Sequence, residues 1–301
     1  MSRQEVVAPG QNTVRLAARS TSSWRPRRGM LGRLGIHLLL LPGAISMLLP
    51  LLWMLTTSLK DSRSIFLYPP KLLPDPVVFS NYTAALAELP VGRAYFNSLY
   101  IAILVTAGSL FTCSLAGYAI ARLRFRGRNF LFAAILGSMM IPLQITLMPT
   151  FIMYQRIGWL DTHYPLIVPA ILTNPFGIFL MRQFIRTIPR DIEDAARVDG
   201  ANPFQIYRQI ILPLVKPALS ALAIFTFMAS YNDFLAPLIF LNSPEKMTVP
   251  VMLAAFKGVY GTVDWGPLMA AASIALVPVV VVYALAQRYF IEGITLSGMK
   301  G

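Results

Sequence analysis

Long runs of neutral, mostly apolar residues alternate with short charged segments along the chain. Each run is long enough to cross about 30 Å of hydrocarbon as a helix, which takes roughly 20 residues. Only one of these runs, 217–244, is interrupted by a charge, that of Asp233. The pattern predicts six transmembrane helices, at approximately 34–58, 95–121, 130–154, 163–182, 217–241 and 266–288.

The spans are expected to be helices rather than β-strands. Lipid cannot satisfy open backbone groups, and the runs lack the alternation of polar and apolar residues that barrel strands show. The composition agrees, since 56% of the residues are hydrophobic, 13% are charged and the mean hydropathy is +0.61. A soluble domain of this composition would expose too much apolar surface. We predict an all-α membrane protein in which residues 30–301 form a six-helix transmembrane domain.

The distribution of Lys and Arg indicates the orientation. If the N-terminus is cytoplasmic, residues 1–33, 122–128, 182–216 and 288–301 lie inside and hold 19 of the 26 Lys and Arg residues. Cytoplasmic loops of membrane proteins carry such an excess. We therefore expect both termini in the cytoplasm, and we attribute the net charge of +13 to topology rather than to binding of nucleic acid.

Residues 1–29 contain Arg, Ser and Pro with few apolar side chains, which predicts a disordered basic cytoplasmic tail. The apolar run that follows is too long for a signal-peptide core, so we expect it to remain as an anchor helix. The single cysteine, Cys113, lies in the second predicted span, so no disulfide framework is expected. Five prolines, Pro142, Pro149, Pro165, Pro169 and Pro175, are each expected to kink or break the third or the fourth span.

The polar loop 189–213 connects the fourth and fifth predicted spans and encodes two short helices on the cytoplasmic face. Asp191, Glu193 and Asp194 place negative charge in a first helical turn, where the helix dipole favours it. Gly200 is suited to close this helix, because glycine readily adopts the left-handed conformation of a helix end. We expect a turn there and then a return to helix.

The second short helix is expected to begin at Asn202. Asparagine is a good N-cap, Pro203 suits the first helical position, and Gln205 completes the spacing of a capping box. The loop is therefore predicted to be a helix-turn-helix that projects from the membrane domain.

In the first short helix Ala195 and Ala196 leave one side slim enough to enter a groove on another protein. Here the loop resembles a motif of the permease subunits of ATP-binding-cassette importers: E-A-A, three residues, G, nine residues, I, one residue and L-P. The chain matches this motif at Ala195, Ala196, Gly200, Ile210, Leu212 and Pro213. Where the motif has Glu the chain has Asp194, with Glu193 directly before it. Either carboxylate could meet the partner.

Three further segments resemble the maltose-type carbohydrate permeases of this family: Ala119–Gly127, Tyr231–Leu238 and Gly293–Gly301. The resemblance covers roughly residues 30–301. It implies a permease subunit in the bacterial inner membrane, paired with a second permease, two cytoplasmic ATPase subunits and an extracytoplasmic solute-binding protein. The implied activity is carbohydrate uptake driven by ATP, with Glu193, Asp194 and the matched motif residues coupling the chain to the ATPase.

The chain has no G-x-x-x-x-G-K-[ST] sequence to hold nucleotide phosphates. We therefore expect ATP and Mg to bind to the ATPase subunits and this chain to be a non-catalytic subunit that binds no cofactor. Closure of the ATPase pair would move the docked loop as a lever and swing the spans between inward-open and outward-open arrangements. The acidic residues of the loop suggest a basic pocket on the ATPase.

Four polar residues of the predicted spans are candidates for the solute pathway: Gln144, Asn174, Asn232 and Asp233. A carboxylate inside the bilayer is unfavourable unless it is paired or wetted. Asp233 is therefore expected either at a gate or solute vestibule, or in a structural hydrogen bond. The amide side chains can bind sugar hydroxyls or join neighbouring helices.

Other functions find less support in the sequence. No metal site is expected, because His37 and His163 have no carboxylate or cysteine at ligand spacing. A membrane-embedded enzyme would need paired carboxylates, a histidine cluster or a nucleophile near one face. A proton-coupled secondary transporter would need several intramembrane ionisable groups. An importer of a solute other than a sugar stays open, since the docking motif says nothing about the cargo.

Overall fold

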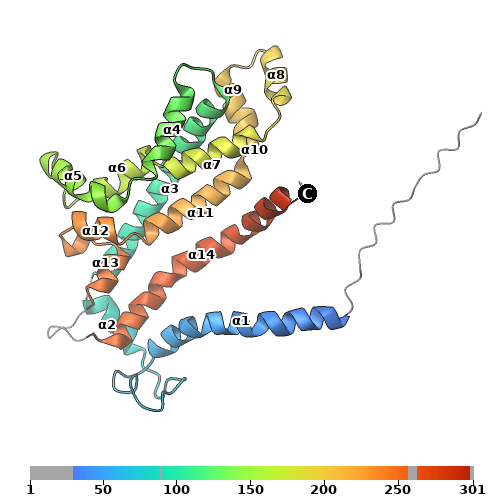
Figure 1. The fold of residues 1–301 in the computed structure, drawn as a ribbon. Helices are drawn as coiled ribbons and strands as arrows, with labels where there is room; N and C mark the ends of the chain where they lie inside the picture. Colours follow the sequence, from blue (N-terminus) through green and yellow to red (C-terminus); the bar gives the residue numbers. More distant parts are fainter. Residues whose placement is uncertain (1–29, 89, 257–262, 299–301) are drawn as a thin grey trace, which may run out of the picture. The chain divides into compact units, whose positions relative to one another are not determined.

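The computed structural model describes residues 30–88, 90–256 and 263–298, and within these ranges all regular structure is helical (Figure 1). The predicted all-α fold is therefore confirmed for the described residues. The chain divides into two units, residues 1–49 and 50–301. The expected disordered tail, 1–29, lies outside the described residues.

Helix α1 covers Met30–Thr57 and includes the boundary between the two units. The other helices belong to the second unit. They are α2 (Ser80–Glu88), α3 (Val91–Arg122), α4 (Arg128–Ser138), α5 (Leu143–Arg156), α6 (Tyr164–Leu172), α7 (Pro175–Arg186), α8 (Asp191–Val198), α9 (Pro203–Ile206), η1 (Tyr207–Ile211), α10 (Leu212–Leu214), α11 (Lys216–Tyr231), α12 (Leu235–Phe240), η2 (Pro244–Lys246), α13 (Val249–Ala254) and α14 (Trp265–Gly298).

Several helical segments are long and apolar enough to cross a membrane. Among the described residues they are 35–57, 91–122, 164–186 and 265–285, and a fifth if the bent pair Pro203–Leu214 and Lys216–Tyr231 is one span. A multi-span membrane protein is thus supported, whereas the predicted count of six is not confirmed.

The third expected span, 130–154, is divided into two helices. Residues 139–142 separate α4 from α5, and Pro142 immediately precedes α5. The fourth expected span is divided as well, because α6 ends before α7 begins at Pro175. Proline lacks a backbone donor and disfavours helix at the residue before it, which explains why the breaks fall there. The breaks fall at Pro142 and Pro175, whereas α5 continues through Pro149 and α6 contains Pro165 and Pro169.

The helix expected over 217–241 ends at Tyr231, ten residues early, so Asp233 lies in the connection to α12 rather than inside a helical span. The backbone N–H of Ala236 donates to Asp233 Oδ1 at 3.4 Å. Aspartate commonly accepts from the backbone at the start of a helix, which accounts for the interruption.

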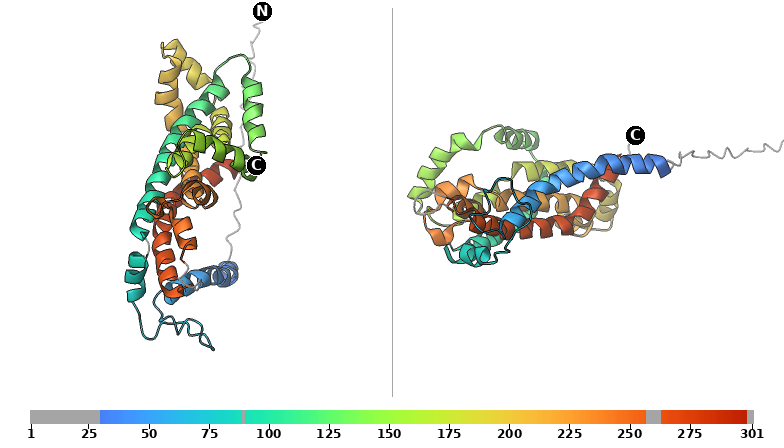
Figure 2. Two further views of the ribbon diagram at one scale, coloured as in Figure 1. Left: turned by 90° about the vertical axis from the view of Figure 1, so that its left-hand side faces the viewer. Right: turned by 90° about the horizontal axis from the view of Figure 1, so that it is seen from below.

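Helix α3 is the centre of the second unit and packs against α6, α7 and α11. The left view of Figure 2 shows it as a long helix that runs along this unit. Two of the glycines permit close approaches between α3 and α7. A Cβ atom on Gly117 would lie 2.7 Å from the Met181 Cβ, and one on Gly177 would lie 2.6 Å from the Cys113 Sγ. Small residues of this kind let membrane helices approach closely.

Candidate functional site

The turn after α8 is built around Gly200. Its φ of +86° is the left-handed conformation that favours glycine. The Ala201 N–H donates to the Ala196 carbonyl at 2.9 Å, and the Gly200 N–H donates to the Arg197 carbonyl at 3.0 Å. These two bonds form a Schellman motif, which satisfies carbonyls at the end of the helix. The prediction that Gly200 closes the first short helix is confirmed.

Helix α9 begins with the predicted capping box. Asn202 Oδ1 accepts from the backbone N–H groups of Phe204 at 3.0 Å and Gln205 at 2.9 Å. In return, Gln205 Oε1 accepts from the Asn202 N–H at 2.7 Å. Pro203 occupies the first helical position. The local sequence therefore determines this second turn of the loop.

The segment after α9 anchors the loop to the membrane domain. Ile206, Tyr207 and Ile211 are buried in a cluster with residues of α3 and α7. The Tyr207 hydroxyl is 2.8 Å from Ser114 Oγ, and the Tyr118 hydroxyl donates to the Pro203 carbonyl at 3.2 Å. The loop is thus fixed to α3 by apolar burial and by two hydroxyl contacts.

A buried ion pair fixes α8 itself. Arg122 Nε, at the end of α3, lies 2.6 Å from Glu193 Oε1, and the two side chains are only 4% and 2% exposed. Arg122 Nη2 also donates to the carbonyls of Ile185 at 2.8 Å and Ile188 at 2.6 Å. One guanidinium therefore joins the ends of α3 and α7 to α8.

From the sequence, Arg122 is one of the basic residues of 122–128 that indicate the orientation of the chain, and nothing more is predicted for its side chain. No local pattern connects it with Glu193, because the two residues belong to distant segments of the chain. The signal that could have indicated the pair was the carboxylate of Glu193. A glutamate beside apolar motif residues needs a cation near it if it is buried.

The two carboxylates that the sequence left as alternatives have different surroundings. Glu193 faces the membrane domain, whereas the side chain of Asp194 is 59% exposed and lies 2.7 Å from Arg197 Nη1. Ala195 is exposed and Ala196 is half-buried. Asp194 and Ala195 are therefore among the residues that α8 presents at its surface, whereas Glu193 is not.

Motif residues that are far apart in the loop meet in one cavity of about 380 Å³. Its lining includes Ala196, Gly200 and Ile210, together with the exposed carboxylate of Asp199. The remaining motif residues, Leu212 and Pro213, are half-buried and exposed respectively. Three of the six matched motif residues therefore share one cavity although they lie far apart in the loop.

A larger cavity, of about 680 Å³, lies between α3, α4, α6, α7 and α11. Two of the four pathway candidates line it, Asn174 and Asp233, alongside the aromatic pair Phe176 and Phe225. Asn174 Oδ1 accepts from the Gly177 N–H at 2.8 Å and so also caps α7. The cavity combines polar groups with aromatic surface, as small-molecule sites do.

The other two pathway candidates do not line this cavity. Gln144 is exposed on α5. Asn232 is also exposed, and its Nδ2 donates to the Met228 carbonyl at 2.9 Å. The structure therefore brings Asn174 and Asp233 together at one cavity, and Gln144 and Asn232 lie outside its lining.

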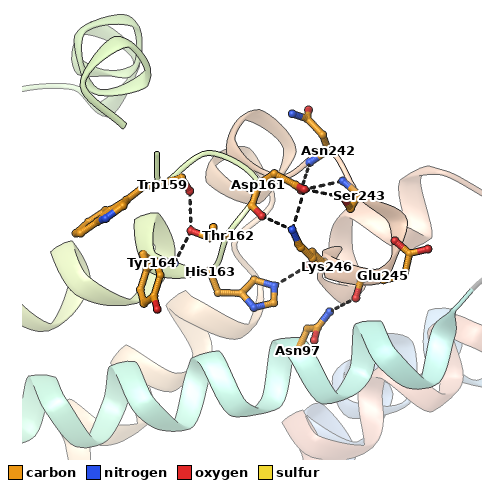
Figure 3. A network of polar contacts seen from close by, with 10 residues as sticks. All are labelled: Asn97, Trp159, Asp161, Thr162, His163, Tyr164, Asn242, Ser243, Glu245 and Lys246. Atoms are coloured by element: carbon orange, nitrogen blue, oxygen red, sulfur yellow. Dashed lines mark hydrogen bonds and ion pairs between the residues drawn. The ribbon is translucent and has the colours of Figure 1, made fainter. Parts of the chain in front are cut away.

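A polar cluster that the sequence did not reveal centres on Asp161, between α5 and α6 (Figure 3). Its carboxylate accepts from the N–H groups of Asn242 at 3.0 Å and Ser243 at 2.9 Å and from the Ser243 hydroxyl at 2.6 Å, and it lies 2.9 Å from Lys246 Nζ. These bonds, that from the Ser243 hydroxyl foremost, hold the pKa of Asp161 well below its usual value. The cluster ties the α5–α6 connection to η2.

His163 extends this cluster to α3. Its Nε2 donates to the Lys246 carbonyl at 2.8 Å, and its Nδ1 contacts the Tyr100 hydroxyl. Asn97 Nδ2 donates to the carbonyls of Glu245 at 2.9 Å and Met247 at 3.0 Å. His163 is therefore a structural residue here. Within the described ranges, no three His, Cys, Asp or Glu side chains are grouped as metal ligands.

Comparison with known proteins identifies the family of the chain. Residues 108–295 match the family model described as "binding-protein-dependent transport system inner membrane component". The arabinooligosaccharides transport system permease protein AraQ of Bacillus subtilis is 35% identical over 272 residues, which cover 89% of this chain and 96% of that protein. The trehalose/maltose transport system permease protein MalG of Thermococcus litoralis is 35% identical over 278 residues, which cover 88% of this chain and 97% of that protein.

A solved structure has the same fold. It is the crystal structure of a bacterial ABC transporter involved in the import of the acidic polysaccharide alginate, with a TM-score of 0.74 and 26% identity over 88% of this chain and 98% of that one. The family model, the relatives and the fold agree with the all-helical structure and the apolar helices described above. The chain therefore belongs to the family of inner membrane permease components of binding-protein-dependent transport systems.

Proposed function

We propose that this chain is a permease subunit of an ATP-binding-cassette importer that carries carbohydrate across the inner membrane. Its family supports the importer, and the names of its relatives support the cargo. Those names refer to arabinooligosaccharides, to trehalose and maltose, and to the polysaccharide alginate. An importer of another solute is the alternative, because the residues of the loop do not contact cargo.

In this function the chain crosses the membrane six times and has both termini in the cytoplasm. The third crossing is made by α4 and α5 together, and the fifth by α11 and the short helices after it. The concentration of Lys and Arg in 1–33, 122–128, 182–216 and 288–301 supports this orientation. The loop that contains α8 and α9 then lies in the cytoplasm.

The chain works with separate subunits and carries out no catalysis itself. A second permease completes the pathway, an extracytoplasmic protein delivers the solute, and two ATPase subunits bind ATP and Mg. The family description, which refers to binding-protein-dependent transport, supports this division of labour. So does the lack of a phosphate-binding G-x-x-x-x-G-K-[ST] sequence in the chain.

The observation that carries the proposal is the attachment of α8 through Arg122 and Glu193. Separating a buried ion pair leaves a charge unpaired, which is unfavourable by about 3–5 kcal/mol. A displacement of α8 by the ATPase is therefore passed to the ends of α3 and α7 instead of being absorbed by the loop. In this arrangement Asp194 and Ala195 contact the ATPase, while Glu193 transmits the movement.

The solute pathway includes the cavity of about 680 Å³ that Asn174 and Asp233 line. Its carboxylate and amide groups can bind hydroxyls, and the rings of Phe176 and Phe225 can pack against the apolar face of a sugar. Gln144 and Asn232 remain candidates for other parts of the pathway. We expect Asp233 to contact the solute directly.

The proposal is tested by co-purification and by transport in reconstituted vesicles. An Ala195→Arg variant adds a bulky side chain at an exposed position of α8, so the fold should survive while docking is blocked. We expect this variant to lose the ATPase subunits and ATP-driven carbohydrate uptake. The matched control is Ala87→Arg, on an exposed position of α2, which should keep both.

Normal ATPase binding by the Ala195→Arg variant would overturn the role of α8. Purification of the intact chain without any ATPase, together with solute uptake in the absence of ATP, would instead identify a stand-alone transporter. ATPase stimulation by a solute other than a sugar would keep the importer and replace the cargo.

A further inference from the structure

Two surface cavities beside α8 share the same two arginines, Arg124 and Arg190. One, of about 430 Å³, lies against α8 and is lined by Arg122, Leu123, Arg124, Arg190, Glu193, Asp194 and Arg197. The other, of about 490 Å³, lies at the α3–α4 turn and is lined by Arg124, Phe125, Gly127, Arg128, Asn129, Phe130 and Arg190. The two cavities form one surface, which we name the arginine face.

The carboxylates of the arginine face are already neutralised. Glu193 is paired with Arg122, and Asp194 is paired with Arg197. Arg124 and Arg190 are exposed and lie within ion-pair distance of no carboxylate among the described residues. With five arginines and two carboxylates, the arginine face has a net charge of +3.

Arg128 adds to this imbalance. Its Nη1 donates to the Leu123 carbonyl at 3.3 Å, which is a neutral partner. The other acidic residues of α8 and its turn do not line either cavity. Asp191 lies outside them, and Asp199 lines the separate cavity with Gly200. The loop as a whole is acidic, but the side that faces the α3–α4 turn is basic.

Membrane topology explains why arginines are abundant here but not why they converge. Arg126 lies in the same turn, is equally exposed and lines neither cavity. Arg124 and Arg190 come from different connections of the chain and still meet at both cavities. Both line the cavity against α8, so a protein that docks on α8 meets them; Figure 1 shows α8 and the α3–α4 turn at the same end of the helical unit.

We propose that the ATPase surface which receives α8 presents carboxylates to Arg124 and Arg190. This rests on the proposed function, because it specifies the chemistry of the partner at the same site. The acidic sequence of the loop suggested a basic pocket on the ATPase, whereas the ion pairs of Glu193 and Asp194 point to the opposite sign at this face. Exposed arginines are well suited to bidentate pairing with carboxylates.

The test measures the affinity of the purified ATPase for the permease complex in lipid nanodiscs, at ionic strengths from about 0.05 M to about 0.5 M. An Arg124→Glu and Arg190→Glu double variant should weaken binding at low salt by about tenfold or more, and its binding should depend less on salt. Replacement of both residues by Lys should restore most of the affinity.

Each control separates one explanation. Arg126→Glu makes the same change of charge in the same turn as Arg124→Glu alone and, unlike that single variant, should bind the ATPase as the unaltered chain does. Among the described residues the side chains of Arg124 and Arg190 form no ion pair, so thermal unfolding of the double variant should be unchanged.

The double variant could bind the ATPase with unaltered affinity while Ala195→Arg still abolishes binding. This result would overturn the proposal of an acidic ATPase surface and would leave the proposed function in place. Unaltered binding in both variants would overturn the proposed function itself. The double variant could instead lose bound anionic phospholipid and keep normal affinity for the ATPase. This result would show that the arginine face binds lipid headgroups, and it would also overturn the proposal.

Discussion

Arg122 and Glu193 form a buried ion pair, 2.6 Å between Nε and Oε1, that connects the end of α3 to α8. The same guanidinium donates to two carbonyls at the end of α7. The pair therefore connects the loop that contains α8 to α3 and α7, two of the helices that line the large cavity. In the proposed function, this connection is what passes a movement of α8 to those helices.

Replacing Glu193 with Met should destabilise the chain by about 3–5 kcal/mol, because the Arg122 charge would remain buried and unpaired. An Arg122→Met and Glu193→Met double variant should be destabilised by less than the sum of the two single changes. Thermal unfolding of the purified single and double variants measures this coupling. Additive losses would mean that the two side chains do not interact in solution.

Gly200→Ala should destabilise the loop through the backbone alone. A Cβ atom at Gly200 meets nothing within 4 Å, whereas the φ of +86° remains unfavourable for alanine by about 1–2 kcal/mol. Gly200→Asn should lose less stability than Gly200→Ala, because asparagine tolerates the left-handed conformation. Hydrogen exchange of the α8–α9 turn compares the two, and equal protection in both would argue against backbone strain as the cause.

Gly117→Ala should destabilise the packing of α3 on α7 by about 1–3 kcal/mol. The added Cβ would lie 2.7 Å from the Met181 Cβ and 3.0 Å from the Arg182 backbone nitrogen, and the latter cannot move without displacing α7. Gly92→Ala, in the same helix with nothing within 4 Å, is the matched control and should lose no stability. Thermal unfolding that ranks Gly92→Ala below Gly117→Ala would contradict the observed contact.

Asp161 should make the stability of the chain depend on pH in the acidic range. Hydrogen bonds from Ser243 and Lys246 lower its folded pKa below the ordinary value of 3.8. Its contribution is therefore fully present above about pH 4 and is lost as the pH falls further, through the lowered folded pKa. Asp161→Asn should be less stable at neutral pH, by about 1–3 kcal/mol. The difference between the two proteins should shrink on acidification; a constant difference would exclude this linkage.

Asp233→Ala should lower carbohydrate transport by about tenfold through a raised KM, which corresponds to the loss of one strong hydrogen bond to the solute. Asn232→Ala changes the neighbouring residue, which does not line the cavity, and should have a smaller effect. Uptake as a function of solute concentration separates KM from kcat. Equal KM values for the two variants and the unaltered chain would remove Asp233 from the pathway.

Local signals made much of the architecture predictable. The apolar run 94–121 corresponds to α3, and the capping box at Asn202 and the turn at Gly200 formed where the sequence placed them. Each depends on residues within a few positions of one another. The third span was predicted over 130–154 because its apolar character continues through Pro142, and the break between α4 and α5 falls at this proline.

Contacts between distant segments could not be read from the chain in the same way. The burial of Glu193 depends on Arg122, and the cluster around Asp161 depends on residues 242–246. The helix–helix packing that brings these groups together is not encoded by any periodic pattern. For the same reason the sequence identified an acidic loop but not the basic face beside it.

Site-specific cross-linking tests the central claim most directly. An Ala195→Cys variant places a reactive thiol on the exposed surface of α8, and the native Cys113 is buried and so should not compete. We predict a cross-link to the ATPase subunit whose yield changes when ATP is added, and none from Ala87→Cys on α2. If Ala195→Cys gave no ATPase adduct, or if both positions cross-linked equally, α8 would not be the element that couples this permease to ATP hydrolysis.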